Sequence, residues 1–90
     1  MIKLFCSDKI KFLTIDNISK NVFKRYNSKD VITLDGLRVK NNHGWWLIRA
    51  SNTEEALIVR FEGKSEKDKN ELFLEIKNFL KNEGLTLDHN

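Results

Sequence analysis

The sequence predicts an α+β domain in which an antiparallel sheet of three to four strands is flanked by two helices on one face. Two segments near the ends of the chain carry apolar residues at helical spacing, and short β-branched and aromatic runs lie between them. The connections between those runs are too short for the crossover that parallel strands require, so the sheet is expected to be antiparallel. The order helix, strands, helix favours two layers.

The composition indicates one folded domain spanning residues 1–90. Hydrophobic residues make up 40% of the chain, which excludes the low hydrophobicity of a disordered protein. There is no proline, no Gly/Ser-rich linker and no repeat that would mark a domain boundary. Sixteen Lys and Arg against thirteen Asp and Glu give a net charge of +3, with the two signs interspersed. This balance favours anionic partners only weakly.

The first helix is expected over about residues 8–26. Its apolar positions recur at three- and four-residue steps, namely Phe12, Ile15, Ile18, Val22 and Tyr26. Its basic residues are Lys9, Lys11, Lys20, Lys24 and Arg25. A nucleic-acid patch is one interpretation of these cations, and a solvated helix face is the commoner one. Residues 1–6 are either a short strand or the remnant of an upstream connection.

The strands are expected at residues 31–34, 37–40, 45–50 and 56–61, where β-branched, aliphatic and aromatic residues dominate. Asp35 and Gly36 fit either a tight turn or a bulge in one longer strand. Residues 41–44, Asn-Asn-His-Gly, are typical of a hairpin loop.

The second helix should begin after Ser65, which precedes acidic residues in a near match to a capping box. Its apolar stripe is formed by Leu72, Phe73, Ile76, Phe79 and Leu80. Gly84 is the expected C-terminal stop.

A cluster of hydrogen-bonding side chains follows the most apolar strand. Alternation along a strand places Trp45, Leu47, Arg49 and Ser51 on one face. Arg49 with Ser51, Asn52 and Thr53 offers donors that suit a phosphate, because a guanidinium can donate two parallel bonds while hydroxyls and loop N–H groups satisfy the other oxygens. The same residues also occur in ordinary hairpin loops that satisfy only their own backbone, so the spacing alone leaves both interpretations open.

Other reactive residue types form no catalytic or metal-binding pattern. Cys6 is the single cysteine and is expected to be a small buried residue. His43 is interpreted as a loop residue, and the adjacent Trp45 and Trp46 as core or cover for the sheet. Arg60 could reach the same face as Arg49 or pair with an acidic neighbour.

Three ordered motifs carry a family resemblance: Asp35 to Val39 (DGLRV), Gly44 to Glu54 (GWWLIRASNTE) and Arg60 to Lys64 (RFEGK). Over about residues 31–82 the chain resembles the C-terminal, fourth domain of the α-D-phosphohexomutases, the phosphomannomutase/phosphoglucomutase family. The resemblance implies a TATA-binding-protein-like fold. It also implies that Arg49, Ser51, Asn52 and Thr53 bind the phosphate of a hexose phosphate during reversible transfer between its 1- and 6-positions.

The family's other signatures do not occur in this sequence. These are its serine loop (TASHNP), its Asp-rich magnesium loop (DGDGD) and its sugar-specificity loop (GExSG). No residue here can therefore be assigned as nucleophile, general base or metal ligand. We expect no turnover by this chain alone, no cofactor within it, and Mg²⁺ only in a full-length mutase. Glu55 stands where the family has proline, and with Glu54 it should weaken anion binding.

The expected partners are a hexose phosphate, bound weakly, and the other mutase domains. No apolar run approaches a membrane span and no signal peptide is recognisable, so a cytoplasmic location is expected. Two alternatives remain. The chain could be a stand-alone module that complements a separately encoded mutase body, or a basic sheet that binds nucleic acid, although nucleic acid is not expected as a partner.

Overall fold

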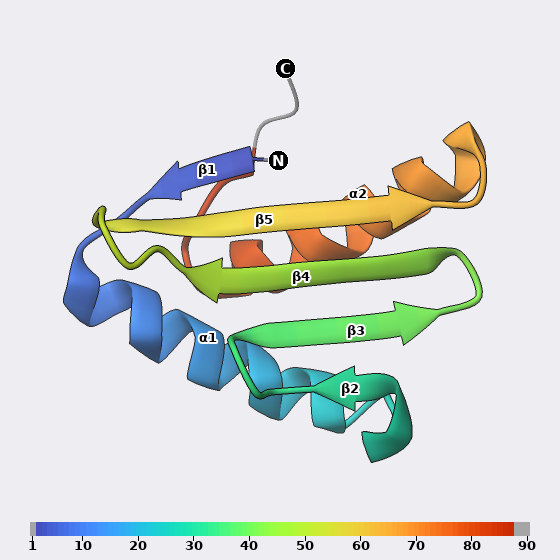
Figure 1. The fold of residues 1–90 in the computed structure, drawn as a ribbon, viewed down its shortest axis with the longest axis horizontal. Coiled ribbons are helices and arrows are strands. Elements are labelled where there is room, and N and C mark those ends of the chain that lie inside the picture. The colour runs from blue at the N-terminus through green and yellow to red at the C-terminus, as the bar shows by residue number, and fades with distance from the viewer. Residues whose placement is uncertain (1, 88–90) are drawn as a thin grey trace.

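The computed structural model describes residues 2–87. The elements follow in the order β1 (Ile2–Phe5), α1 (Asp8–Phe23), the short 3-10 helix η1 (Ser28–Asp30), β2 (Val31–Ile32), β3 (Leu37–Asn41), β4 (Gly44–Ala50), β5 (Ala56–Gly63) and α2 (Glu66–Asn82) (Figure 1). The predicted α+β class is confirmed. Each predicted strand from residue 37 onward is present and is one to two residues longer than expected.

The five strands form one fully antiparallel sheet in the order β1-β5-β4-β3-β2. The prediction of three to four strands was one or two too low, for two reasons. Residues 2–5 pair with β5 as an edge strand. The segment around Asp35 and Gly36 is a turn, so β2 and β3 pair with each other as separate strands.

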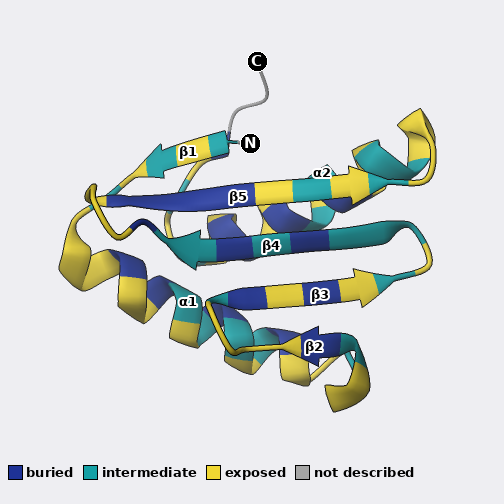
Figure 2. Cartoon of the chain, in the orientation of Figure 1, coloured by how far each residue is buried: buried dark blue, intermediate teal, exposed yellow. Residues whose placement is uncertain are grey.

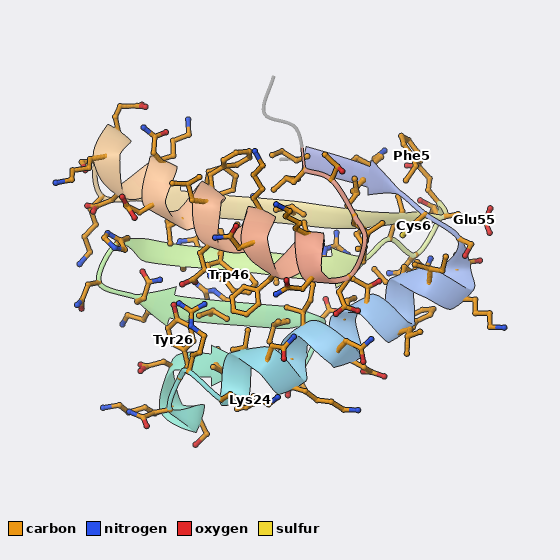
Figure 3. All side chains as sticks on the ribbon, turned by 180° about the vertical axis from the view of Figure 1, so that it is seen from behind. Phe5, Cys6, Lys24, Tyr26, Trp46 and Glu55 are labelled. Atoms are coloured by element: carbon orange, nitrogen blue, oxygen red, sulfur yellow. The ribbon has the colours of Figure 1, made fainter. Side chains whose placement is uncertain are left out.

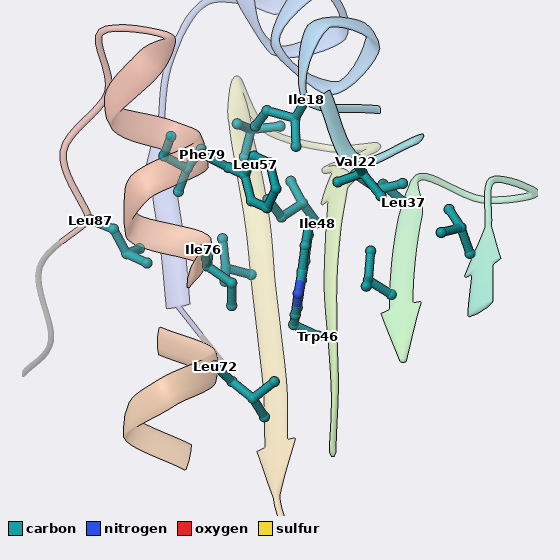
Figure 4. Packing of buried hydrophobic residues seen from close by; sticks show 14 residues of the cluster. Ile18, Val22, Leu37, Trp46, Ile48, Leu57, Leu72, Ile76, Phe79 and Leu87 are labelled. Carbon is teal, nitrogen blue, oxygen red and sulfur yellow. The ribbon is translucent and has the colours of Figure 1, made fainter. Parts of the chain in front are cut away.

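Both α-helices cover the same face of the sheet, and neither of them covers the opposite face (Figures 1 and 3). The core lies between these layers, with Trp46 and Ile48 of β4, Leu57 and Val59 of β5 and Leu72 of α2 all completely buried. Figure 4 shows this packing, and Figure 2 shows buried and exposed residues alternating along β3. The alternation predicted for β4 is confirmed over residues 45–50, because Trp46 and Ile48 are buried while Trp45, Leu47 and Arg49 are half-buried.

The buried stripe of α1 differs from the predicted one. The helix buries Lys11, Thr14, Ile18 and Val22, whereas Phe12 is 59% exposed. The prediction assumed that apolar residues alone would mark the covered side. The first turns of α1 instead lie against the carbonyl groups of the loop after β4, where a cation and a hydroxyl suit the environment better than a phenyl ring.

The second helix confirms its predicted start, stripe and stop. Ser65 caps it, since its Oγ accepts a hydrogen bond from the backbone N–H of Asp68 at 3.1 Å. Gly84 follows the helix with φ +77°, and its N–H donates to the carbonyl of Lys81 at 3.0 Å. A left-handed residue at this position is the usual way to end a helix.

A polar cluster joins α2 to the sheet. The Glu75 carboxylate accepts hydrogen bonds from Trp46 Nε1 at 2.6 Å and from the Tyr26 hydroxyl at 2.8 Å, and Asn41 Nδ2 donates to that hydroxyl at 3.0 Å. Burial is the main reason that the pKa of Tyr26 is raised. The first helix was predicted to reach Tyr26, but it ends at Phe23, so Tyr26 lies beyond the helix and its hydrogen bonds were not foreseen from periodicity.

Candidate functional site

Arg49 is the second-to-last residue of β4. It stands opposite Ile58 in the register with β5, on the face that carries no helix. Arg60 lies on the same face, opposite Leu47, as one sequence interpretation proposed. Within residues 2–87 neither guanidinium forms an ion pair. Arg49 is half-buried and its hydrogen-bonding capacity is available to a ligand.

Residues 51–55 turn the chain from β4 into β5. The N–H of Ser51 donates to the carbonyl of Ala56 at 2.9 Å, and the N–H of Ala56 donates to the carbonyl of Glu54 at 2.9 Å. The Ser51 hydroxyl oxygen accepts from the N–H groups of Thr53 and Glu54 at 3.4 and 3.2 Å. Ser51 is only 5% exposed, so the alternation of β4 does not continue to it. Its side chain shapes the loop from inside.

Lys11 of α1 anchors this loop by hydrogen bonds. Its Nζ donates to the carbonyl of Ser51 at 2.8 Å and to that of Glu54 at 3.1 Å, and it lies 2.6 Å from Asp8 Oδ1. The Lys11 side chain is 6% exposed, so its assignment to a solvated helix face was wrong. A lysine near the start of an amphipathic helix is ordinarily solvated, and this one is buried because it donates to two carbonyl groups of the loop and pairs with Asp8.

Gly36 packs against the backbone at Arg49. It adopts φ +92°, a conformation that glycine reaches without strain. A Cβ at this position would lie 2.6 Å from both the Arg49 Cβ and the Ile48 carbonyl oxygen. The Asp35-Gly36 turn is therefore a close neighbour of the candidate site, and glycine is required there by space as well as by backbone conformation.

The two acidic residues of the loop have partners. Lys3 Nζ lies 2.5 Å from Glu54 Oε1, and Glu55 Oε1 accepts from the N–H of Asp8 at 3.4 Å. Figure 3 shows Glu55 at the same end of the molecule as Phe5 and Cys6. The repulsion expected from the two glutamates is thereby reduced at Glu54, where a cation neutralises the charge. Nearby, burial raises the pKa of the Cys6 thiol.

The structure leaves Arg49 and Asn52 on different sides of the strand end. Asn52 lines a hollow of about 350 Å³ that lies against α1, together with Asp16, Asp35 and Gly36, and Arg49 is not among its lining residues. The hollow holds two carboxylates, so it is a poor place for an anion. Asn52 forms no hydrogen bond within the described residues, and the Thr53 side chain forms none either.

Sequence reasoning missed a contact at the opposite end of the sheet. His43 Nδ1 lies 2.7 Å from Asp68 Oδ1, although His43 had been interpreted as a loop residue without a carboxylate partner. The hydrogen bond from His43 is the main cause of the lowered pKa of Asp68. The pair arises because the hairpin and the start of α2 meet, which the carbonyl of His43 confirms by accepting from the N–H of Lys64 at 3.0 Å.

Residues 2–87 contain neither a metal-binding cluster nor a helix that could span a membrane. No group of three or more His, Cys, Asp or Glu side chains is arranged to hold a metal ion. None of the helices described by the structure is long and apolar enough to cross a membrane.

The chain is a two-layer α+β domain, with an open antiparallel sheet and helices on one face. Its candidate site is an arginine-headed polar loop at a strand end. Residues 1–79 match the family model for the phosphoglucomutase/phosphomannomutase C-terminal domain. The chain therefore belongs to the phosphoglucomutase/phosphomannomutase family, as its C-terminal domain. The match begins about thirty residues before the region that carries the resemblance in the sequence, and it includes β1 and α1.

Curated relatives agree with this assignment. The chain is 32% identical over 80 residues to a phosphomannomutase/phosphoglucomutase of Pseudomonas aeruginosa, covering 89% of this chain and 17% of that protein. It is 39% identical over 88 residues to a phosphoglucosamine mutase of Methanococcus vannielii, covering 98% and 18%. A phosphoglucosamine mutase of Methanococcus maripaludis is 44% identical over 64 residues, covering 71% and 14%. The chain thus spans less than a fifth of the length of these relatives.

Proposed function

We propose that the chain is the substrate-phosphate-binding module of a hexose-phosphate mutase and that it has no turnover of its own. Arg49 is the main ligand, Thr53 supplies a further donor and Ser51 holds the loop in shape. Asn52 lines the hollow on the other side of the strand end, so it can join the same phosphate only if the loop rearranges. The observation that carries the proposal is the contrast within this loop. Ser51 and Lys11 are committed to internal hydrogen bonds, whereas Arg49 and Asn52 have no partner among the described residues.

A phosphate bound here would lie on the uncovered side of the strand end, away from Asp16 and Asp35. There the Arg49 guanidinium can donate two parallel bonds to one phosphate, each worth about 1.5–3 kcal/mol because the partner is charged. Binding and orienting a substrate phosphate is what phosphoryl transfer demands of a residue outside the reacting centre. The proposal assigns these residues to phosphate binding alone, and no step of it passes through a metal.

Arg49→Ala should weaken binding of glucose 1-phosphate by at least tenfold, because it removes one or more charge-assisted bonds. Isothermal calorimetry on the 90-residue chain measures the effect, and glucosamine and mannose phosphates extend the test to other hexoses. The matched control is Arg60→Ala, which removes a second unpaired guanidinium from the same face. Equal losses in both variants would show general attraction to positive charge and would contradict a specific site at Arg49.

A second role, docking onto a separately encoded mutase body, has one observation in its favour. Large apolar side chains remain exposed, including Phe5 at 70%, Phe12 at 59%, Leu13 at 57% and Leu34 at 93%, and Phe12 lines the same hollow as Asn52. Exposed apolar side chains in such number are typical of interaction surfaces. Mixing the chain with a mutase that lacks this domain should restore activity if this role is correct, and unchanged activity would exclude it.

A further inference from the structure

We propose that the uncovered face of the sheet carries a second anion site, specific for an organic phosphate of mononucleotide size. The site is a cavity of about 470 Å³ at the hairpin end of β3 and β4, lined also by residues of η1 and the end of β5. This volume falls within the range of about 300–1,000 Å³ that is usual for small-molecule sites. The proposal does not rest on the function assigned to the 49–53 loop.

The cavity is lined by more cations than anions. Lys29, Arg38, Lys40 and Lys64 contribute positive charge, whereas Asp30 and Glu62 contribute negative charge. Within residues 2–87 none of these six side chains forms an ion pair. Four cations against two carboxylates leave an excess of positive charge on one concave surface, which favours a ligand with more than one negative charge.

Arg38 is held in place before any ligand binds. Its Cζ lies 4.9 Å from the centre of the Trp45 ring, which is within the range of a cation–π contact. The two residues share the uncovered face, because Trp45 pairs with Lys40 and Arg38 pairs with Leu47 across β3 and β4. A guanidinium stacked in this way keeps its N–H edge free and loses less freedom when it binds an oxyanion.

The other lining residues can contact parts of a ligand beyond its phosphate group. Ile32 is 52% exposed and Trp45 is half-buried, so both offer apolar surface to a ring. Asp30 and Glu62 can accept hydrogen bonds from hydroxyl or amino groups. A phosphate ester that carries a sugar and a flat base satisfies the cations, the carboxylates and the apolar surface together. Inorganic phosphate satisfies only the cations.

This cavity is separate from the loop after β4. Trp45 precedes Arg49 by four residues along one strand, which corresponds to about 13 Å at the rise of about 3.3 Å per residue. Figure 1 shows the start of β4 at the hairpin and its end at the loop toward β5. The two sites can therefore be distinguished residue by residue, and a variant at either one serves as the control for the other.

The test is an NMR titration of the labelled chain with AMP, in which backbone amides and the Trp45 indole N–H are followed. We expect the Trp45 indole signal and the Lys40 and Lys64 amides to shift, while the Asn52 and Thr53 amides move little. Arg38→Ala should weaken AMP binding by at least tenfold, and Arg49→Ala should leave it within about twofold. Lys40→Ala, with a smaller loss, keeps the test valid if Arg38→Ala is poorly folded.

Three further ligands decide the chemical class. Ribose 5-phosphate and inorganic phosphate should bind progressively more weakly than AMP, because they lack first the base and then the sugar. Inorganic phosphate binding as tightly as AMP would overturn the proposed ring recognition. A single-stranded oligothymidylate that binds this face when AMP does not would identify a nucleic-acid surface instead. The absence of any shift at Trp45 up to about 10 mM AMP, an affinity weaker than about 3 kcal/mol, would overturn the site altogether.

Discussion

At the Ala50 end of β4, charged and polar side chains are mostly engaged in holding a loop together, whereas at the Gly44 end Arg38 and Lys40 line a cavity without forming an ion pair among the described residues. Lys11 is buried under the loop and donates to two carbonyl groups, and Ser51 caps two N–H groups of the same loop. Near Gly44, Arg38 and Lys40 form no ion pair within residues 2–87.

The comparison shows that a cation's role depends on the groups it faces. Lys11 donates to the buried carbonyl of Ser51, which has no other donor among the described residues, so it acts structurally. Arg38 faces an aromatic ring and an open cavity, so its N–H groups remain available. Arg49 resembles Arg38 in this respect, although it lies next to the engaged loop. Substitutions at the loop end should therefore lower stability, and substitutions of the free arginines should lower binding.

Gly36→Ala should give the largest loss of stability. The left-handed conformation costs a non-glycine residue about 1–2 kcal/mol and overpacking adds about 1–3 kcal/mol, so we expect about 3 kcal/mol in total. Urea unfolding measures the effect, and Asp35→Ala on the same exposed turn is the control. A loss below about 0.5 kcal/mol would mean that the turn does not pack against Arg49 as described.

Lys11→Met should give the second-largest effect and lower the free energy of unfolding by about 2 kcal/mol. The substitution keeps an apolar stem but leaves the carbonyl of Ser51 without its donor in a buried place. Lys9→Met, on the exposed side of the same turn, should change the free energy of unfolding by less than about 0.5 kcal/mol. If the two variants unfold at the same urea concentration, Lys11 does not anchor the loop.

The smallest effect concerns pH at the hairpin end. Because the hydrogen bond from His43 lowers the pKa of Asp68 below its usual 3.8, this carboxylate contributes stability above about pH 4 and loses the contribution as the pH falls further. Acidification from pH 5 to pH 3 should therefore destabilise Asp68→Asn and His43→Ala less than the unsubstituted chain. Parallel stability curves for all three proteins would show that the His43–Asp68 contact contributes nothing.

Most of the fold could be predicted because its elements follow local rules. The stripe of α2, the Ser65 cap and the alternation of Trp45 to Ala50 each depend on neighbours in sequence, and the structure confirms them. The stripe of α1 was predicted correctly at Ile18 and Val22 but wrongly at Phe12, because Lys11 takes the buried position beside a loop forty residues away. The His43–Asp68 pair was missed for the same reason. Long-range polar contacts leave no periodic signal in one sequence.

The candidate site was predictable to a similar degree. The motif identified the residues at the strand end, but it gave no indication that Ser51 is buried or that Asn52 and Arg49 lie on different sides. Those features depend on Lys11, Gly36 and the end of β4 meeting in space. Spacing could suggest the donors; only the packing shows which of them are free.

The most direct test of the central claim is an NMR titration of the chain with glucose 1-phosphate, with each amide followed separately. If the loop binds phosphate through Arg49, the Asn52 and Thr53 amides shift with one saturable affinity, and Arg49→Ala abolishes the shifts while Arg38→Ala preserves them. Unmoved loop amides up to tens of millimolar ligand, an affinity of about 2 kcal/mol, would contradict phosphate binding by this domain.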